Sequence, residues 1–263
     1  MLLKEFSLRS LKTRVTLFTL SIFLLSIWSL TFTASRMLRR DMEVQLGTQQ
    51  LSTASFVAKS IGNDLDERIQ TLSKVAGRIT ELEPKNHTAM QALLEERLIL
   101  QGPFNAGVAY LDIKGTVLAE VPLSAGRIGI NYSDRKYIAA VLEQGKPMIS
   151  SPLIGKKPAS PLFGIAVPVF DKQNKIVGVL AGITNLDQTN FLDDLTEKPY
   201  GKTGSYLLVA PHDRRIITSS DNKRIMEQLP GAGVNPALDR FIAGFEGSQI
   251  YVNPRGVEVL ASD

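Results

Sequence analysis

The residues best suited to bind a small charged molecule lie close together in the sequence, at Tyr132, Arg135 and Tyr137. Arg135 follows a loop that contains Tyr132 and opens a helical pattern that contains Tyr137. A guanidinium group offers a planar fork of donors that matches the two oxygens of a carboxylate. Two interpretations stay open: a clamp for a ligand carboxylate, or a structural arginine that pairs with Asp134 or with a backbone carbonyl.

Other groupings resemble catalytic motifs, and each lacks a required partner. Gly201-Lys202-Thr203 matches the end of a phosphate-binding loop, but Thr196 stands where that loop needs a glycine. His212-Asp213 has only one other histidine in the chain, His87, whereas metal catalysis needs several convergent ligands. Asp193-Asp194 are adjacent carboxylates, which do not face each other on a helix, so we place them on a solvated helix face. Ser150-Ser151 and Ser219-Ser220 lack a nearby histidine that could activate a serine nucleophile. We therefore predict no catalytic residue, no metal site and no cofactor.

Composition narrows the class of protein. The 263 residues, 44% of them hydrophobic, predict one large or two small domains with a packed core. The net charge is +4, and much of the basic excess lies near the N-terminus, which argues against nucleic acid as a partner. The absence of cysteine excludes disulfides, cysteine-ligated zinc and a cysteine nucleophile.

Residues 15–35 contain no charged side chain and follow a basic segment, residues 1–14. A helix needs about 20 apolar residues to cross a bilayer, so we predict a transmembrane helix at 15–35 and a cytoplasmic N-terminus at 1–14. The alternative is a cleaved signal peptide, for which Thr33-Ala34-Ser35 offers small residues.

A long helix is predicted from Asp41 to Glu83, because apolar residues recur there at three- and four-residue spacing. We expect one half of this helix to pack in the core and the other half, continuous with the membrane span, to pair with a second copy. A second helix is predicted from His87 to Leu100. The apolar stripe of the long helix consists of Ile61, Leu65, Ile69, Leu72, Ala76, Ile79 and Leu82.

Strand patterns follow in two cycles. Ala106–Val121 reads as strand, turn and strand, and a short helix from Asp187 to Leu195 is expected to connect the cycles. The central apolar runs are Met148–Ile154, Leu162–Phe170 and Ile176–Leu186. The second cycle starts at Gly204 and loosely repeats the order of the first, which predicts two related modules along the chain. Its predicted elements are strands at 205–210, 215–218, 249–252 and 257–261 and a helix at 237–245.

The stretch from Asn131 to Asp187 resembles the membrane-distal module of double Cache sensor domains. The resemblance lies in ordered motifs: D-R-x-Y, a helix ending in G-K-P, then S-x-P, I-A-V-P-V, G-V-L-A-G and L-D. It implies an α+β fold in which a long N-terminal helix carries two PAS-like antiparallel-sheet modules. The implied domains are a stalk helix at 36–83, a distal module at 84–200 and a truncated proximal module at 201–263.

The resemblance also implies a ligand pocket in the distal module. In amino-acid-sensing members, an Arg-x-Trp pair holds the carboxylate of the ligand, and Arg135 and Tyr137 match this pair approximately. The positions that hold the ammonium group in those members correspond to Leu153 and Ile183 in this sequence. We expect a carboxylate without an α-amino group to bind better than the matching amino acid, and a polyamine to be disfavoured unless Asp134 turns inward and supplies the missing charge. The implied pocket residues are Tyr132, Asp134, Arg135, Tyr137, Ser150, Ser151 and Thr184.

The function implied is extracytoplasmic sensing of a small molecule by a protein of the bacterial inner membrane. A second copy of the chain, paired through the long helix, is the expected protein partner. The fragment itself is then not an enzyme, and the output domain lies outside it. The N-terminal run resembles proteins that end in diguanylate cyclase or histidine kinase domains, with a chemoreceptor as the next option. The alternative is a membrane-tethered exported enzyme or a structural module without sensing.

The uninterrupted uncharged run leads to a first prediction: residues 15–35 stay attached to the mature protein as its anchor. N-terminal sequencing of the protein purified from membranes should find the original N-terminus. A start near Ser35 or Arg36 would instead identify a cleaved signal peptide.

Overall fold

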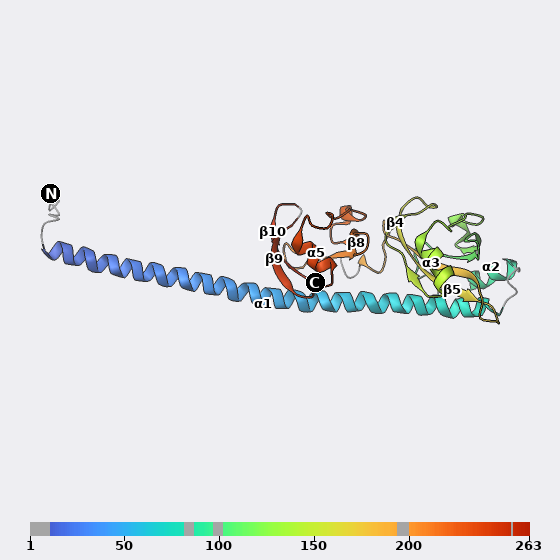
Figure 1. Ribbon diagram of the computed structural model, residues 1–263, viewed down its shortest axis with the longest axis horizontal. Coiled ribbons are helices and arrows are strands. Elements are labelled where there is room, and N and C mark those ends of the chain that lie inside the picture. The colour runs from blue at the N-terminus through green and yellow to red at the C-terminus, as the bar shows by residue number, and fades with distance from the viewer. Residues whose placement is uncertain (1–10, 82–86, 97–101, 194–199, 254) are drawn as a thin grey trace. The chain divides into compact units, whose positions relative to one another are not determined.

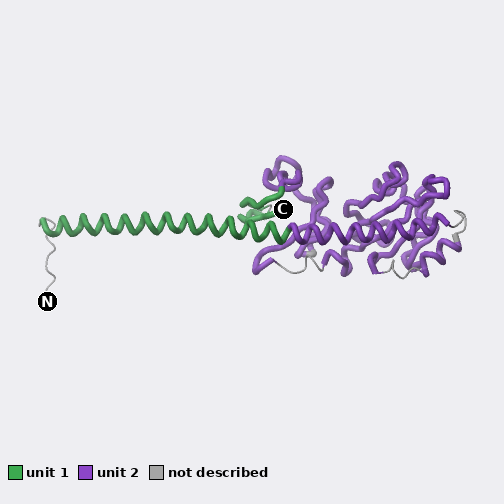
Figure 2. Tube along the Cα trace, turned by 90° about the horizontal axis from the view of Figure 1, so that it is seen from below, with its two compact units in different colours: residues 1–54, 246–263 green, residues 55–245 purple. Residues whose placement is uncertain are grey.

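The computed structural model describes residues 11–81, 87–96, 102–193, 200–253 and 255–263 (Figure 1). The chain divides into two compact units, one formed by residues 1–54 with 246–263 and the other by residues 55–245 (Figure 2). The fold is α+β, with a long N-terminal helix and antiparallel sheets, as the sequence predicts.

Helix α1 runs without interruption from Leu11 to Ile79 and contains both the predicted membrane span and most of the predicted stalk helix. Its most apolar window is not buried in the protein, so by length and composition this helix can cross a membrane. A signal sequence near the N-terminus passes the same test. The predicted end of the helix, at Pro84, lies outside the described residues.

The smaller unit combines the first part of α1 with a hairpin of strands β9 (Ser248–Val252) and β10 (Glu258–Ser262). The Ser248 hydroxyl donates to the Gly47 carbonyl of α1 at 2.7 Å. A Cβ at Gly47 would come within 2.9 Å of the Ser248 Cβ. Glycine at this helical position therefore allows the close approach of the hairpin.

The larger unit is built around a six-stranded antiparallel sheet with the order β2-β1-β6-β5-β3, in which β4 also pairs with β5. The predicted run Met148–Ile154 is not one strand, because Ser150, Ser151 and Pro152 separate β3 from β4. The strands are β1 (Val108–Asp112), β2 (Val117–Val121), β3 (Met148–Ile149), β4 (Leu153–Ile154), β5 (Pro161–Phe170) and β6 (Ile176–Asn185).

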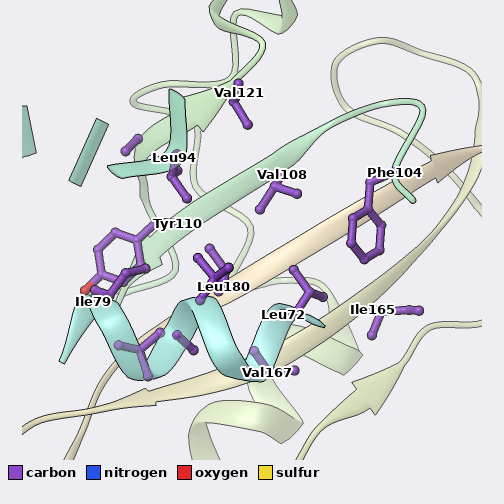
Figure 3. Packing of buried hydrophobic residues seen from close by; sticks show 14 of the residues in the cluster. Leu72, Ile79, Leu94, Phe104, Val108, Tyr110, Val121, Ile165, Val167 and Leu180 are labelled. Carbon is purple, nitrogen blue, oxygen red and sulfur yellow. The ribbon is translucent and has the colours of Figure 1, made fainter. Parts of the chain in front are cut away.

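Side chains alternate between the two faces of this sheet, and each face packs against different helices. On one face, Val108 and Tyr110 of β1 meet Leu72 and Ile79 of α1 together with Leu94 of α2 (His87–Glu96), as Figure 3 shows. The intervening β1 residues join the other face, which helix α3 (Lys136–Gln144) covers. The predicted stripe of the long helix packs on the first of these faces: Ile61, Leu72, Ala76 and Ile79 are at most 6% exposed, and Leu65 and Ile69 are partly buried, whereas Leu82 lies outside the described residues. The predicted extension of α2 to Leu100 lies outside the described residues.

The predicted connecting helix is absent over residues 187–192, which form turns and irregular backbone. Side-chain bonds to the backbone make Asn190 an N-cap: its backbone N–H donates to Asp193 Oδ2 at 2.9 Å, and the Leu192 N–H donates to Asn190 Oδ1 at 3.1 Å, so the residues before Asn190 are not helical. Asp193 is 8% exposed, so it does not lie on the solvated face that the sequence suggested. Residues 194 and 195 are outside the described part of the chain.

The second cycle of elements forms as predicted in type and order. Strands β7 (Leu207–Ala210) and β8 (Arg215–Ser219) pair as a hairpin, and α5 (Pro236–Ile242) starts at Asn235, whose side chain accepts from the Leu238 N–H. Arg214 pairs with Asp239 of α5 at 2.5 Å and fixes this helix beside the hairpin. Two short 3-10 turns complete the described elements: η2 (Leu123–Ala125) and η3 (Asn222–Arg224).

Candidate ligand-binding site

A cavity lies on the face of the sheet that α3 covers. About 450 Å³ of it is free of atoms, and part of that space is open to solvent. The enclosed part has room for only about two waters, so a bound ligand requires lining side chains to move. The apolar part of the lining consists of Ala109, Leu111, Val117, Ile138, Leu153, Leu162, Ala181 and Ile183.

Tyr132 reaches this cavity because its loop is tied to the β1–β2 hairpin. The Tyr132 N–H donates to the Gly115 carbonyl at 2.8 Å, and the Asn131 side chain donates to the Lys114 carbonyl at 2.8 Å. Gly115 has φ +80°, and a Cβ there would lie 2.9 Å from the Ser133 nitrogen. A glycine in this turn therefore lets the loop approach the hairpin closely enough to aim Tyr132 inward.

Arg135 is the N-cap residue of α3, with φ −83° and ψ 116°, and its side chain makes no capping bond. Ser, Thr, Asp or Asn would stabilise the helix better at this position. The guanidinium instead lines the cavity, where Nη2 donates to the Ile154 carbonyl at 3.1 Å. Its Nε lies 3.8 Å from Asp134 Oδ2 and has no hydrogen-bond partner. The side chain is 22% exposed, so Arg135 faces the cavity and not open solvent.

Tyr137 lies at the first turn of α3 with its ring against the backbone of β5. A Cβ at Gly164 would come within 2.8 Å of the Tyr137 hydroxyl oxygen, so only glycine leaves space for this ring. Burial raises the pKa of Tyr137 to about 12 and raises the pKa of Tyr132 in the same way. Both hydroxyls therefore stay protonated at neutral pH and can donate to an anionic ligand.

A buried ion pair lies behind the cavity, and of its two residues only Arg127 belongs to the lining. Glu120 pairs with Ala109 across the sheet, so its side chain lies on the cavity face. Its two carboxylate oxygens accept from Arg127 Nε at 2.8 Å and from the Arg127 backbone N–H at 2.7 Å. The two side chains are 1% and 3% exposed. Arg127 lines the cavity, and its Nη2 atom is buried without a hydrogen-bond partner among the described residues.

Two lysines complete the charged lining at Lys156 and Lys157. Lys156 Nζ donates to Asp134 Oδ1 at 2.6 Å and to the Asn131 carbonyl at 2.8 Å, and it lies 5.3 Å from the centre of the Tyr132 ring. The hydrogen bond from Lys156 lowers the pKa of Asp134 below its usual range. Among the residues that the structure describes, the lining thus contains arginine and lysine but no aspartate or glutamate.

The structure brings together Tyr132, Arg135 and Tyr137 of the predicted pocket residues. Asp134 lies beside them but outside the lining, with its side chain 58% exposed and bonded to Lys156.

The other predicted residues lie elsewhere. The hydroxyl of Ser150 accepts from the Gly164 N–H at 2.8 Å, and half-buried Ser151 lies outside the lining. Thr184 pairs with Phe163 across the sheet and so belongs to the α1 face, away from the cavity. Sequence reasoning placed it in the pocket because it did not fix the register of β6.

Sequence reasoning missed Arg127, Lys156 and Lys157, which belong to segments without regular periodicity. The sequence does contain one signal that points to Arg127. Glu120 is an acid inside the apolar run Val117–Val121, and a charge in a strand of a central sheet needs a partner. The nearest basic residue after that strand is Arg127.

Comparison with known proteins gives the family. The model of the Cache domain family (dCache_1) matches residues 35–262. The chain belongs to this family. Cache domains of this kind are extracytoplasmic sensors of membrane receptors, and the resemblance drawn from the sequence is thereby confirmed. A search of curated protein sequences finds no match.

Solved structures share the fold of this Cache domain. One is the ligand-binding domain of the Pseudomonas aeruginosa PAO1 amino acid chemoreceptor PctC, in complex with GABA. The match has a TM-score of 0.62 at 18% sequence identity, and it covers 84% of this chain and 91% of the PctC chain. The corresponding domain of PctB from the same organism, in complex with L-Gln, has a TM-score of 0.61 at 19% identity, with 81% of each chain covered. The periplasmic sensory domain of Campylobacter jejuni Tlp1 has a TM-score of 0.63 at 14% identity, with 83% and 89% covered.

The buried pair leads to a stability prediction. Arg127→Ala should lower the free energy of unfolding by about 3–5 kcal/mol, because it leaves the Glu120 carboxylate buried and uncompensated. The double variant Glu120→Gln/Arg127→Gln removes both charges together, so it leaves no unpaired buried charge and should lose clearly less. Urea unfolding of the chain in detergent, followed by circular dichroism, measures both.

Lys172→Ala is a matched control, since Lys172 is an exposed cation outside this cavity. Equal losses in the single and the double variant would contradict mutual neutralisation of Glu120 and Arg127.

Proposed function

We propose that this Cache domain senses a small carboxylate without an α-amino group and binds it in the cavity between α3 and the sheet. The observation that carries the proposal is the charge of the lining: Arg127, Arg135, Lys156 and Lys157 face it, and no carboxylate does in the part of the chain that the structure describes. Arg135 Nε and the Tyr132 hydroxyl are buried there without a partner. A carboxylate offers the acceptors that these donors need.

The absence of an ammonium partner separates this cavity from an amino-acid site. The related domains of PctC and PctB are in complex with GABA and L-Gln, which carry an ammonium group. In the present cavity, the two positions that resemblance assigns to the ammonium are Leu153 and Ile183, and both are part of the apolar lining. An ammonium buried against these side chains would lose its hydration without compensation, at a cost of several kcal/mol.

The proposal extends to the rest of the receptor. Residues 15–35 would anchor the chain in the bacterial inner membrane, and the modules at 84–200 and 201–263 would lie outside the cytoplasm. Pairing of two copies through α1 is supported by apolar side chains that are exposed along it, at Met42, Val44, Leu46 and Phe56. Ligand binding would move the paired helices and regulate an output domain, a diguanylate cyclase or a histidine kinase first and a chemoreceptor signalling domain next.

Calorimetry on the chain in lipid nanodiscs tests the ligand class with two matched pairs, butyrate against 2-aminobutyrate and succinate against aspartate. The acid without the α-amino group should bind more tightly in each pair. Arg135→Ala should weaken its binding by about 2–5 kcal/mol, the usual cost of truncating one side of a buried charge pair. Lys175→Ala, in the exposed β5–β6 turn, should leave binding unchanged.

Tighter binding of both α-amino acids, insensitive to Arg135→Ala, would overturn the assignment of the site and its ligand class together.

A further inference from the structure

We propose that the ligand carries two carboxylates on a short carbon chain, and that Arg127 binds the second carboxylate while Arg135 binds the first. This inference rests on the proposed function and specifies it: it names the class of carboxylate and adds a binding residue that neither the sequence motifs nor the resemblance assigned.

The first step concerns donors that lack acceptors. Three lining residues each have a buried polar atom without a hydrogen-bond partner: Nη2 of Arg127, the hydroxyl of Tyr132 and Nε of Arg135. A buried donor that stays unpaired costs about 1–3 kcal/mol, and more when it belongs to a charged group. Two of these atoms belong to different guanidinium groups, which reach the cavity from the segment after β2 and from the start of α3.

The second step concerns the geometry of the Glu120–Arg127 pair. Both carboxylate oxygens of Glu120 are engaged by the backbone N–H and Nε of Arg127, so the pair neutralises the charge without using Nη2. The guanidinium is held rigidly, with its side chain 3% exposed. Arg127 is therefore a preorganised donor in the cavity wall, whose bonding an acceptor from a ligand would complete.

The third step concerns the balance of charge. The lining contains four cationic side chains, at Arg127, Arg135, Lys156 and Lys157. Glu120 offsets Arg127, and Asp134 is shared between Lys156 at 2.6 Å and Arg135 at 3.8 Å. Those two acids leave an excess of two positive charges around the cavity. A dianion matches this excess, whereas a monocarboxylate leaves part of it uncompensated in a partly desolvated site.

The test compares succinate with butyrate, acids of equal chain length that differ by one carboxylate, by calorimetry on the chain in nanodiscs. Wild-type protein should bind succinate at least about tenfold more tightly, since one added charge-assisted contact of about 1.4 kcal/mol gives that factor. Glu120→Gln/Arg127→Gln should reduce the preference to near unity, while binding of butyrate through Arg135 persists. Lys172→Gln should keep the wild-type preference.

A second variant keeps the proposal testable if the double variant does not fold. Arg127→Lys keeps a cation beside Glu120 but removes the planar fork, so it should weaken succinate binding more than butyrate binding. Equal affinity of wild-type protein for the two acids, or a preference unchanged in both variants, overturns the role of Arg127 while leaving carboxylate sensing in place. Binding of neither acid overturns both proposals.

Discussion

The alternation of side chains across the six-stranded sheet is the constraint on which the rest of this domain depends. Residues of β1 that face one way pack on α1 and α2, and their neighbours face the cavity under α3. The same sheet thus has one face packed on the long helix and the other open to the cavity under α3. A ligand that changes the cavity face acts on strands whose opposite face holds α1, and this shared layer gives a physical route from the site to the helix.

Two features around the cavity are less favourable for the stability of the fold than the alternatives would be. An arginine occupies the N-cap of α3, where a short polar side chain would stabilise the helix, and a charged pair is buried where apolar residues would pack as well. Such departures from local preference are typical of functional sites. Here they leave donors from two arginines and a tyrosine without partners in one place, which structural roles alone do not require.

The sequence predicted the elements better than the site. The apolar stripe of the long helix and the ordered motifs from D-R-x-Y to L-D identified the fold. Both are visible in the sequence because helix periodicity and the order of short motifs depend on residues that are close together in the chain. Tyr132, Arg135 and Tyr137 could be placed in the cavity because they surround the start of one helix. Thr184 could not, since its face depends on strand register, and Arg127 could not, since an ion pair across an irregular segment leaves no periodic signal.

The most direct test of the cationic cavity is a crystal structure of the chain grown with succinate. The account predicts the ligand between α3 and the sheet, with one carboxylate within about 3 Å of the Arg135 guanidinium and the other within about 3 Å of Arg127 Nη2. Lys156 and Lys157, which are exposed residues of the lining, should have moved outward to admit it. Succinate bound elsewhere, with both arginines keeping only their present partners, would contradict the account.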